Sequence, residues 1–353
     1  MTAAPRRGDR LPRVRTVTAV LGLALMAGCG ESMPAGTDAG TDAGADAGVV
    51  DAGVVDAAGA VDAGPRACGV CATWGSNTRA ETVMDDALRE VSGLAESRRR
   101  PGWYWVHNDS GDSARVFAVD SAGRTRLELA LEGARAVDWG DLAVGPCGTG
   151  GTSTCVWVGD IGDNNRRRSD CAVLRFDESV LDAVGDNPTV RAMQSVRPET
   201  MPVRYPDGAR DAEALVVDPA TGRFVVITKE PTGPAGVYAQ PEAAGTDGVW
   251  GLVRVGEMEV PAPGSTLVTA ADWHPCAPRL LVRTYDRVLE YAGAPGASLA
   301  TVIAATPTVL PAAREIQGEA VAWALDGHSF VTLSEGRAQS FRVTPCAAST
   351  AGR

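Results

Sequence analysis

The sequence predicts an all-β protein with the architecture of a β-propeller, and three observations support this fold class. Between residues 67 and 348, short β-branched and aromatic runs alternate with Gly, Asp, Asn and Pro, which is typical of antiparallel strands joined by turns. Five segments repeat one apolar pattern, as successive blades do. Only residues 81–90 and 178–184 are brief helix candidates.

Each repeat opens with an apolar run beside acidic or small residues. The opening segments are residues 90–96, 138–144, 210–216, 269–273 and 316–322. Second and third apolar runs follow in every repeat, and a fourth follows in the first four repeats. We therefore predict five four-stranded blades, while residues 178–209 leave room for a sixth. A β-sandwich is the alternative, although it would not require this repetition.

The fifth repeat ends before it reaches a fourth strand. Residues 79–88 precede the first repeat and can supply the missing strand by pairing into the last blade. Such closure removes the free strand edge that otherwise promotes aggregation. We predict a ring closed by an N-terminal strand in the last blade.

Residues 1–28 have the features of a lipoprotein signal peptide. Five arginines precede an apolar stretch of about eleven residues, which is shorter than the roughly 20 that a membrane span requires. The stretch ends in Leu-Met-Ala-Gly-Cys, which resembles a lipobox with Cys29 as the lipidated residue. Glu31 follows at the second position after the cysteine, and the sorting pattern of such lipoproteins then implies the outer membrane, on its periplasmic or its surface face. The alternative is an ordinary signal peptide with an incidental cysteine.

Residues 29–66 consist largely of Asp-Ala-Gly repeats without aromatic residues. Such a segment has little apolar surface to bury, so we expect a disordered tether. A propeller domain over residues 67–348 and a short tail over 349–353 complete the expected organisation.

The charge balance excludes some partners. The chain has a formal net charge of -11, and loss of the arginine-rich signal makes the mature protein more acidic still. A chain of this charge has no electrostatic footprint for nucleic acid. It suits divalent cations or cationic partners better, and its three histidines do not favour a multi-histidine zinc site. We expect a monomer that contacts the membrane through its lipid anchor.

Seven cysteines remain once Cys29 carries the lipid. An exported protein can form disulfides, and Cys147 and Cys155 flank a short turn, so we predict a bond across that hairpin. Cys68 or Cys71 can pair with Cys346 and join the two ends of the domain. The odd number leaves one thiol free or paired between chains.

The first strand of each propeller blade lines the central channel. Aligning the repeats places Gly93 and four carboxylates in one column: Asp141, Glu213, Asp272 and Glu319. Crowded carboxylates raise one another's pKa unless a cation intervenes, and calcium prefers such oxygen ligands. The column therefore predicts a calcium-binding channel. Alternatively, these carboxylates accept hydrogen bonds from backbone amides and mark strand ends.

A second set of polar residues follows the second strands, at one mouth of the predicted channel. Asn108 and Asp160 are candidate ligands there, although both lie in sequences typical of turns. Lys229 and Arg283 stand among many acids and either pair with them or hold an anion such as phosphate. No Gly-x-Ser-x-Gly elbow and no phosphate-binding Gly-Lys-Ser/Thr loop occurs.

Several short motifs together resemble a known group of proteins. They are His-Asn-Asp-Ser-Gly (107–111), Asp-Trp-Gly-Asp-Leu-Ala (138–143), Gly-Asp-Ile-Gly-Asp-Asn (159–164), Tyr-Pro-Asp-Gly (205–208), Asp-Ala-Glu-Ala-Leu (211–215), Thr-Lys (228–229), Arg-Thr-Tyr (283–285) and Gln-Gly-Glu-Ala (317–320). The set looks like uncharacterised secreted bacterial β-propeller lipoproteins and, more distantly, phytase-like and SdiA-regulated propellers. The resemblance covers about residues 88–343 and implies a propeller with an acidic, calcium-binding channel. Gly140 departs from the usual Glu of Asp-Trp-Glu-Asp, which removes one ligand.

Two functions follow from these expectations. The first is an exported propeller that binds a ligand or a protein and holds calcium in its acidic channel. The alternative is a calcium-dependent, phytase-like phosphoester hydrolase in which Lys229 and Arg283 hold phosphate. Phosphoryl chemistry can proceed through a metal and positioning alone, so the missing nucleophile does not exclude it.

Overall fold

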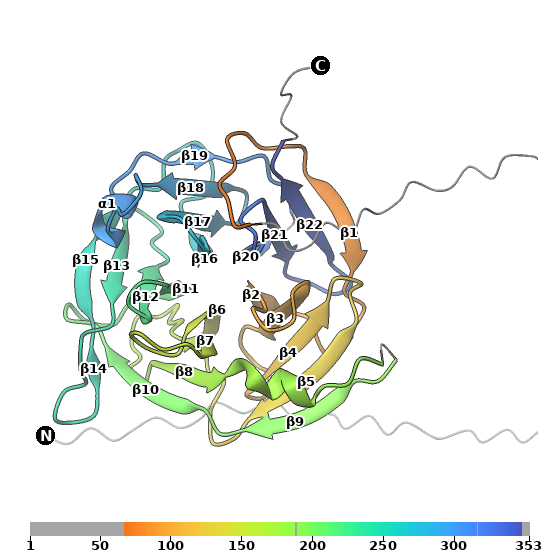
Figure 1. Cartoon of the computed structure of the whole chain (residues 1–353). Coiled ribbons are helices and arrows are strands. Elements are labelled where there is room, and N and C mark those ends of the chain that lie inside the picture. Colours follow the sequence, from red (N-terminus) through yellow and green to blue (C-terminus); the bar gives the residue numbers. More distant parts are fainter. Residues whose placement is uncertain (1–66, 188, 316, 348–353) are drawn as a thin grey trace, which may run out of the picture. The chain divides into compact units, whose positions relative to one another are not determined.

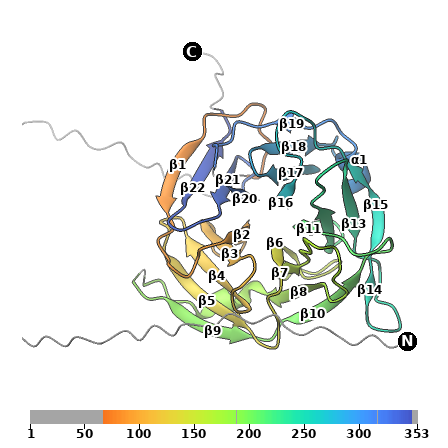
Figure 2. The ribbon, with the colours of Figure 1, turned by 180° about the vertical axis from the view of Figure 1, so that it is seen from behind.

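Five small β-sheets stand in a ring around a common axis, and the views from both sides show the same closed arrangement (Figures 1 and 2). The computed structural model describes residues 67–187, 189–315 and 317–347. The predicted signal peptide, the predicted lipidation of Cys29 and the predicted tether fall on residues 1–66, outside the described residues, and the predicted tail at 349–353 lies outside them too. The ring confirms the predicted β-propeller and its five blades.

Each blade has an inner strand beside the axis and further strands that pair outward. Blade 1 contains β2 (Val91–Glu96), β3 (Trp103–Asn108), β4 (Arg115–Asp120) and β5 (Thr125–Leu131). Blade 2 contains β6 (Trp139–Pro146), β7 (Thr154–Asp160), β8 (Ala172–Asp177) and β10 (Glu199–Arg204). Blade 3 contains β11 (Ala212–Asp218), β12 (Arg223–Thr228), β13 (Ala235–Ala239) and β15 (Val253–Met258). Blade 4 contains β16 (Val268–Trp273), β17 (Arg279–Thr284), β18 (Val288–Ala292) and β19 (Thr308–Val309). Blade 5 contains β20 (Gly318–Trp323), β21 (Ser329–Ser334) and β22 (Ser340–Pro345).

An N-terminal strand closes the ring, as predicted. β1 (Thr78–Thr82) pairs antiparallel with β22 and becomes the outer strand of blade 5. The fifth blade is therefore built from both ends of the domain, and its outermost pairing joins segments more than 250 residues apart in sequence.

The long second repeat does not form a sixth blade in the described part of the chain. Residues 178–183 form a short 3-10 helix, η1 (Glu178–Ala183), and β9 (Ala192–Val196) pairs parallel with β5 as an added outer strand of blade 1. A similar addition, β14 (Trp250–Gly251), pairs parallel with β10 of blade 2. The short helix α1 (Leu299–Ile303) precedes β19, whereas the helix candidate at 81–90 instead completes β1 and continues as turns. No helix among the described residues is long and apolar enough to cross a membrane.

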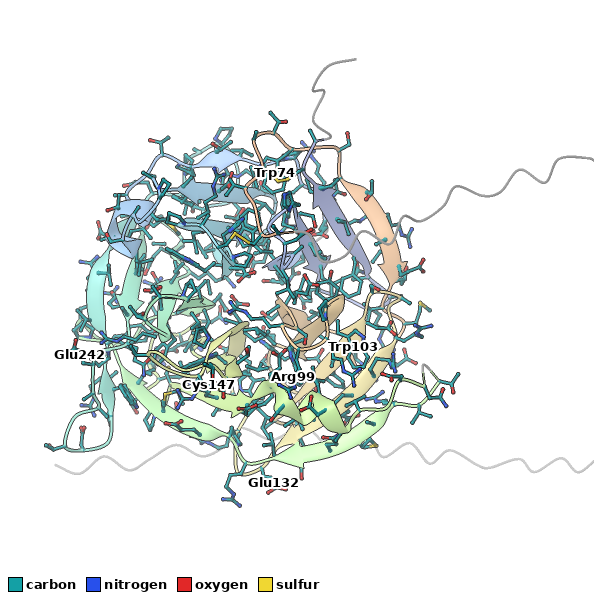
Figure 3. The ribbon with its side chains drawn as sticks, in the orientation of Figure 1. Trp74, Arg99, Trp103, Glu132, Cys147 and Glu242 are labelled. Carbon is teal, nitrogen blue, oxygen red and sulfur yellow. A yellow bond between two sulfur atoms is a disulfide. The ribbon has the colours of Figure 1, made fainter. Side chains whose placement is uncertain are left out.

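Side chains fill the spaces between neighbouring blades (Figure 3). Large fully buried residues from strands of successive blades pack there, among them Trp105, Trp157, Phe224 and Phe330. Burial of this much apolar surface is the main favourable contribution to folding. It holds the inner strands at fixed positions around the axis.

Three disulfides cross-link the domain. Cys147–Cys155 spans the hairpin between β6 and β7, as predicted, and Cys71–Cys346 joins the two ends of the domain. Cys68–Cys276 was not predicted. Cys171 is the one cysteine without a bond among the seven in the described residues, and it is buried.

The two ends of the ring differ in what they present. Each inner strand pairs antiparallel with the second strand of its blade, so the start of the inner strand lies beside the end of the second strand. One end of the ring therefore gathers the starts of β2, β6, β11, β16 and β20. The opposite end carries the turns that follow these five strands.

Candidate functional site

Each inner strand carries a β-bulge near its start, and the bulge fixes which residues are equivalent between blades. Pairing with the second strand shifts register at one residue in every blade: Ser92, Gly140, Glu213, Thr269 and Glu319. Glu213 and Glu319 are therefore equivalent, whereas Asp141 lies one residue and Asp272 three residues beyond the bulge of its own strand.

The predicted single column of Gly93, Asp141, Glu213, Asp272 and Glu319 is wrong in register. That alignment matched the carboxylates to one another, but pairing with the second strand sets the real equivalence. The four acids are spread along the channel. Glu213 and Glu319 lie near one mouth, Asp141 lies deeper, and Asp272 lies toward the opposite end.

Asp141 is fully buried and accepts three backbone hydrogen bonds. Oδ1 accepts from the amide of Leu142 at 2.9 Å, and Oδ2 accepts from Leu215 at 3.0 Å and Ala271 at 3.1 Å. The three amides come from equivalent positions in blades 2, 3 and 4. Burial raises the pKa of the Asp141 carboxyl well above its usual value, and the amides oppose this rise. Its oxygens bind backbone, as the alternative interpretation of the column expects.

Asp272 and Asp160 also have partners within the fold. Asp272 accepts the Trp323 amide at 2.7 Å. Burial raises the pKa of Asp272 to about 7, partly offset by that amide and by Arg98. Asp160 lies 2.8 Å from the Arg168 guanidinium, and burial raises its pKa against the effect of that cation.

Polar side chains from all five blades meet at the end of the ring where the inner strands start. We call this group the acidic mouth: Asp109, Asp138, Glu213, Glu319, Lys229 and Tyr285. Lys229 Nζ lies 3.5 Å from Glu213 Oε1 and 5.2 Å from the centre of the Tyr285 ring. Four carboxylates thus share one ammonium group.

Three carboxyl groups of the acidic mouth have raised pKa values. Burial, followed by the neighbouring Asp138 carboxylate, raises the pKa of Asp109 to about 8. Burial also raises the pKa of Glu319 to about 7, with Lys229 opposing it. Burial raises the pKa of Glu213 well above its usual value, although Lys229 opposes this rise. Burial is thus the main cause of these raised pKa values, and repulsion between neighbouring carboxylates adds to it.

Arg283 is paired with Glu315 and not with Lys229, although its guanidinium lies close enough to Glu319 to lower the pKa of that carboxyl. Its side chain is fully buried, its Nη2 lies 2.6 Å from Glu315 Oε2, and its guanidinium packs against Gly318. Arg283 and Lys229 therefore do not form a joint anion site in this structure.

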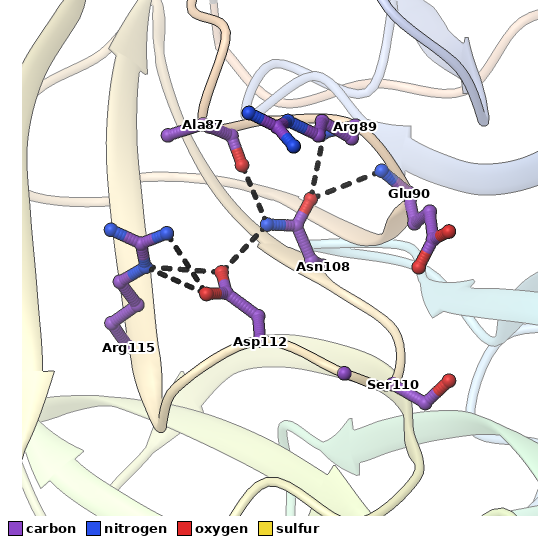
Figure 4. Close-up of a pocket in the computed structure, with 8 residues that line it drawn as sticks. Ala87, Arg89, Glu90, Asn108, Ser110, Asp112 and Arg115 are labelled. Atoms are coloured by element: carbon purple, nitrogen blue, oxygen red, sulfur yellow. Dashed lines mark hydrogen bonds and ion pairs between the residues drawn. The ribbon is translucent and has the colours of Figure 1, made fainter. Parts of the chain in front are cut away.

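The side-chain amide of Asn108 forms hydrogen bonds mainly with the backbone around it. Its Oδ1 accepts from the amides of Arg89 and Glu90, and its Nδ2 donates to Ala87 O and to Asp112 (Figure 4). These bonds form the wall of a hollow of about 430 Å³ that Arg89, Ser110 and Arg115 also line. The Asn108 amide thus shapes the loop after β3, and all of its polar atoms have partners.

The acidic mouth contains carboxylate oxygens, which calcium prefers as ligands. However, no three carboxylates of the described residues lie close enough together to form a preformed calcium site. Asp109 and Asp138 come close enough to interact through their carboxyl groups. Among the residues that the structure describes, no third carboxylate lies within 4.8 Å of both. A calcium ion here would have two carboxylate ligands and would take its remaining oxygens from water or backbone.

Sequence reasoning singled out Glu213, Glu319 and Lys229. It also suggests Asp109 as a calcium ligand and Asp138 as an added negative charge, but it gives no role to Tyr285. All three stand in motifs noticed in the sequence, at 107–111, 138–143 and 283–285. Their position directly after a second strand or directly before an inner strand was the available signal.

Residue 140 is a glycine because the neighbouring blade approaches its backbone closely. A Cβ at this position would lie 2.6 Å from Glu213 Oε2 and 2.7 Å from Glu213 Cα. The Glu that the resemblance leads one to expect at residue 140 would require β11 to move. Glycine here lets Glu213 reach the acidic mouth.

We expect Gly140→Ala to lower the free energy of unfolding by about 2 kcal/mol, because overpacking a tight contact costs about 1–3 kcal/mol. Urea denaturation followed by circular dichroism measures the change. Gly148→Ala is the control, since a Cβ there would meet no atom within 4 Å. Equal stability of the two variants would contradict the close approach.

The sequence matches no protein-family model, and no curated protein shows significant similarity to it.

Proposed function

We propose that this protein is an exported binding propeller whose acidic mouth takes up a cation, with calcium as the expected ion. The observation that supports the proposal is the excess of carboxylates over cations at one end of the ring. Blades 1, 2, 3 and 5 each contribute a carboxylate, while Lys229 and, beside Glu319, the buried Arg283 are the basic groups that oppose them.

Burial and then repulsion from Asp138 raise the pKa of Asp109 to about 8, and a bound cation would oppose both effects. Calcium suits the acidic mouth because it takes six to eight oxygen ligands in flexible geometry and accepts water among them. Asp109 and Asp138 are the expected protein ligands, with Glu319 and Glu213 adding negative potential. With only two carboxylate ligands, we expect a dissociation constant of about 10⁻⁴ to 10⁻³ M, as in other extracellular calcium modules.

Export and lipid anchoring at Cys29 remain part of the proposal. The three disulfides suit an oxidising compartment, and the signal peptide in the sequence agrees with that location. Cys68, near the start of the described chain, is bonded to Cys276 in the turn between β16 and β17. That turn lies at the end of the ring opposite to the acidic mouth.

The alternative, a calcium-dependent phosphoester hydrolase, has weaker support. It needs cationic groups that hold phosphate, and the buried pair of Arg283 with Glu315 leaves Lys229 as the one such group at the acidic mouth. Lys229 is itself paired with Glu213. We therefore propose binding as the function and treat phosphate release as an outcome of the test.

We expect calcium to raise the melting temperature of the purified protein at pH 8 and to give a saturable signal in isothermal titration calorimetry. Asp109→Asn should weaken calcium binding by about tenfold, because it removes one of two carboxylate ligands. Asp186→Asn is the matched control, since the Asp186 side chain is 91% exposed and belongs to a surface ion pair. Protons compete with calcium at Asp109, so affinity should fall as the pH drops below about 8.

The same samples distinguish the two functions. Calcium-dependent release of phosphate from p-nitrophenyl phosphate that is lost in Glu213→Gln would favour the hydrolase. Calcium binding that is unchanged in Asp109→Asn would overturn the assignment of the cation to the acidic mouth.

A further inference from the structure

A second cluster of ligand-type side chains lies at the end of the ring opposite to the acidic mouth. Sγ of Cys68, Sγ of Cys276 and a ring nitrogen of His274 all lie within 4.8 Å of one another. Within the described residues this is the one group of three His, Cys, Asp or Glu side chains that meets this distance. The two cysteines are joined as a disulfide, so in the oxidised protein their sulfur atoms are not thiolates.

We propose that reduction of Cys68–Cys276 converts this cluster into a zinc site with Cys68, Cys276 and His274 as ligands. A tetrahedral zinc ion holds sulfur at about 2.3 Å and nitrogen at about 2.0–2.1 Å, which puts its ligand atoms roughly 3.5–3.8 Å apart. The three side chains already lie near that spacing. Opening the S–S bond requires the two sulfur atoms to separate by less than about 2 Å.

The imidazole of His274 is arranged as a metal ligand would be. It is fully buried, and its Nε2 has no hydrogen-bond partner among the described residues. Its Nδ1 accepts the amide of Cys276 at 3.2 Å, and its ring packs edge-on against Trp323 with centroids 4.5 Å apart.

The cluster supplies three ligand atoms, so water would complete the tetrahedron. His328 lies nearby, against Gly69, but its Nδ1 lies 3.7 Å from Asp326 Oδ2. Thiolate with imidazole is a donor set that suits zinc.

The chemistry balances with a dithiol as reductant. The dithiol supplies two electrons and two protons and becomes a disulfide itself, while the Cys68–Cys276 bond breaks into two thiols. Zinc then displaces one proton from each thiol. Cys68 and Cys276 are exposed, whereas Cys71 and Cys155 are buried, so limited reductant should open this bond first. The metal would then keep the N-terminal segment attached to blade 4 in place of the disulfide.

The test uses the purified wild-type chain after limited dithiol treatment, with native near-UV circular dichroism as the check on folding. Zinc or EDTA is added, free thiols are alkylated with iodoacetamide, and each cysteine is quantified by mass spectrometry. We expect zinc to slow alkylation of Cys68 and Cys276 by at least about tenfold. Any reduced Cys147 and Cys155 serve as internal controls and should react at the same rate with and without zinc.

A variant separates this site from adventitious binding by thiols. His274→Gln should reduce the protection of Cys68 and Cys276 by about tenfold or more, while the oxidised protein should bind no stoichiometric zinc. Equal alkylation rates with zinc and with EDTA would overturn the proposal. Full protection in His274→Gln would also overturn it, because two thiolates alone would then account for binding.

Discussion

Asp141→Asn is expected to lower the free energy of unfolding by about 4 kcal/mol. The substitution replaces Oδ2, which accepts the amides of Leu215 and Ala271, by an NH₂ group that cannot accept them. Each amide hydrogen bond to a charged group contributes about 1.5–3 kcal/mol, and a buried amide left without a partner costs about 1–3 kcal/mol. The two amides belong to blades 3 and 4, so the loss would loosen the ring at its axis. Urea denaturation followed by tryptophan fluorescence measures it.

Asp272→Asn provides the matched control. Asp272 stands in an inner strand as Asp141 does, but its carboxylate accepts one amide from the next blade, that of Trp323. We expect this variant to lose about 2 kcal/mol or less, since at most one inter-blade bond is affected. If Asp272→Asn proved as destabilising as Asp141→Asn, the idea that Asp141 joins three blades would be wrong.

The sequence was sufficient to predict the ring of blades, because the repeated blades are visible as repeated apolar runs. Five inner strands, their second and third strands and the closing strand from residues 78–82 all follow from runs that alternate with turn residues. Additions that depend on neighbouring blades were not predictable. β9 pairs parallel with β5, and its half-exposed sequence contains no sign of that partner.

The candidate site was predicted in composition but not in geometry. Glu213 and Lys229 do meet at one mouth, because the start of an inner strand and the end of a second strand lie together. Asp141 and Asp272 do not join them, since they lie one and three residues beyond the bulge that Glu213 occupies in its own strand, and the apolar pattern does not reveal this offset. Arg283 was expected either to pair with an acid or to hold an anion, and it pairs with Glu315 in a buried position. A single sequence does not reveal which charged residue finds a buried partner far along the chain.

Removal of the Cys71–Cys346 bond, by Cys71→Ser with Cys346→Ser, is expected to lower the free energy of unfolding by about 4 kcal/mol. A disulfide stabilises mainly by restricting the unfolded chain, and the effect grows slowly with the length of the loop it closes. The two residues are 275 positions apart. Cys68–Cys276 already shortens the path between them to about 70 residues, which still corresponds to about 4 kcal/mol in the entropic relation.

The hairpin bond tests that reasoning in the same fold. Cys147–Cys155 closes a separation of 8 residues, so Cys147→Ser with Cys155→Ser should cost only about 2 to 3 kcal/mol. Both pairs are compared by urea denaturation without reductant. If the Cys71/Cys346 variant lost no more free energy of unfolding than the Cys147/Cys155 variant, the entropic expectation would be contradicted. In that case the pairing of β1 with β22 would be enough to close the ring without the covalent bond. A larger loss of free energy of unfolding in the Cys71/Cys346 variant would show that the disulfide contributes to the closure of blade 5. The bond would do so because it limits how far β1 can move when its hydrogen bonds to β22 break.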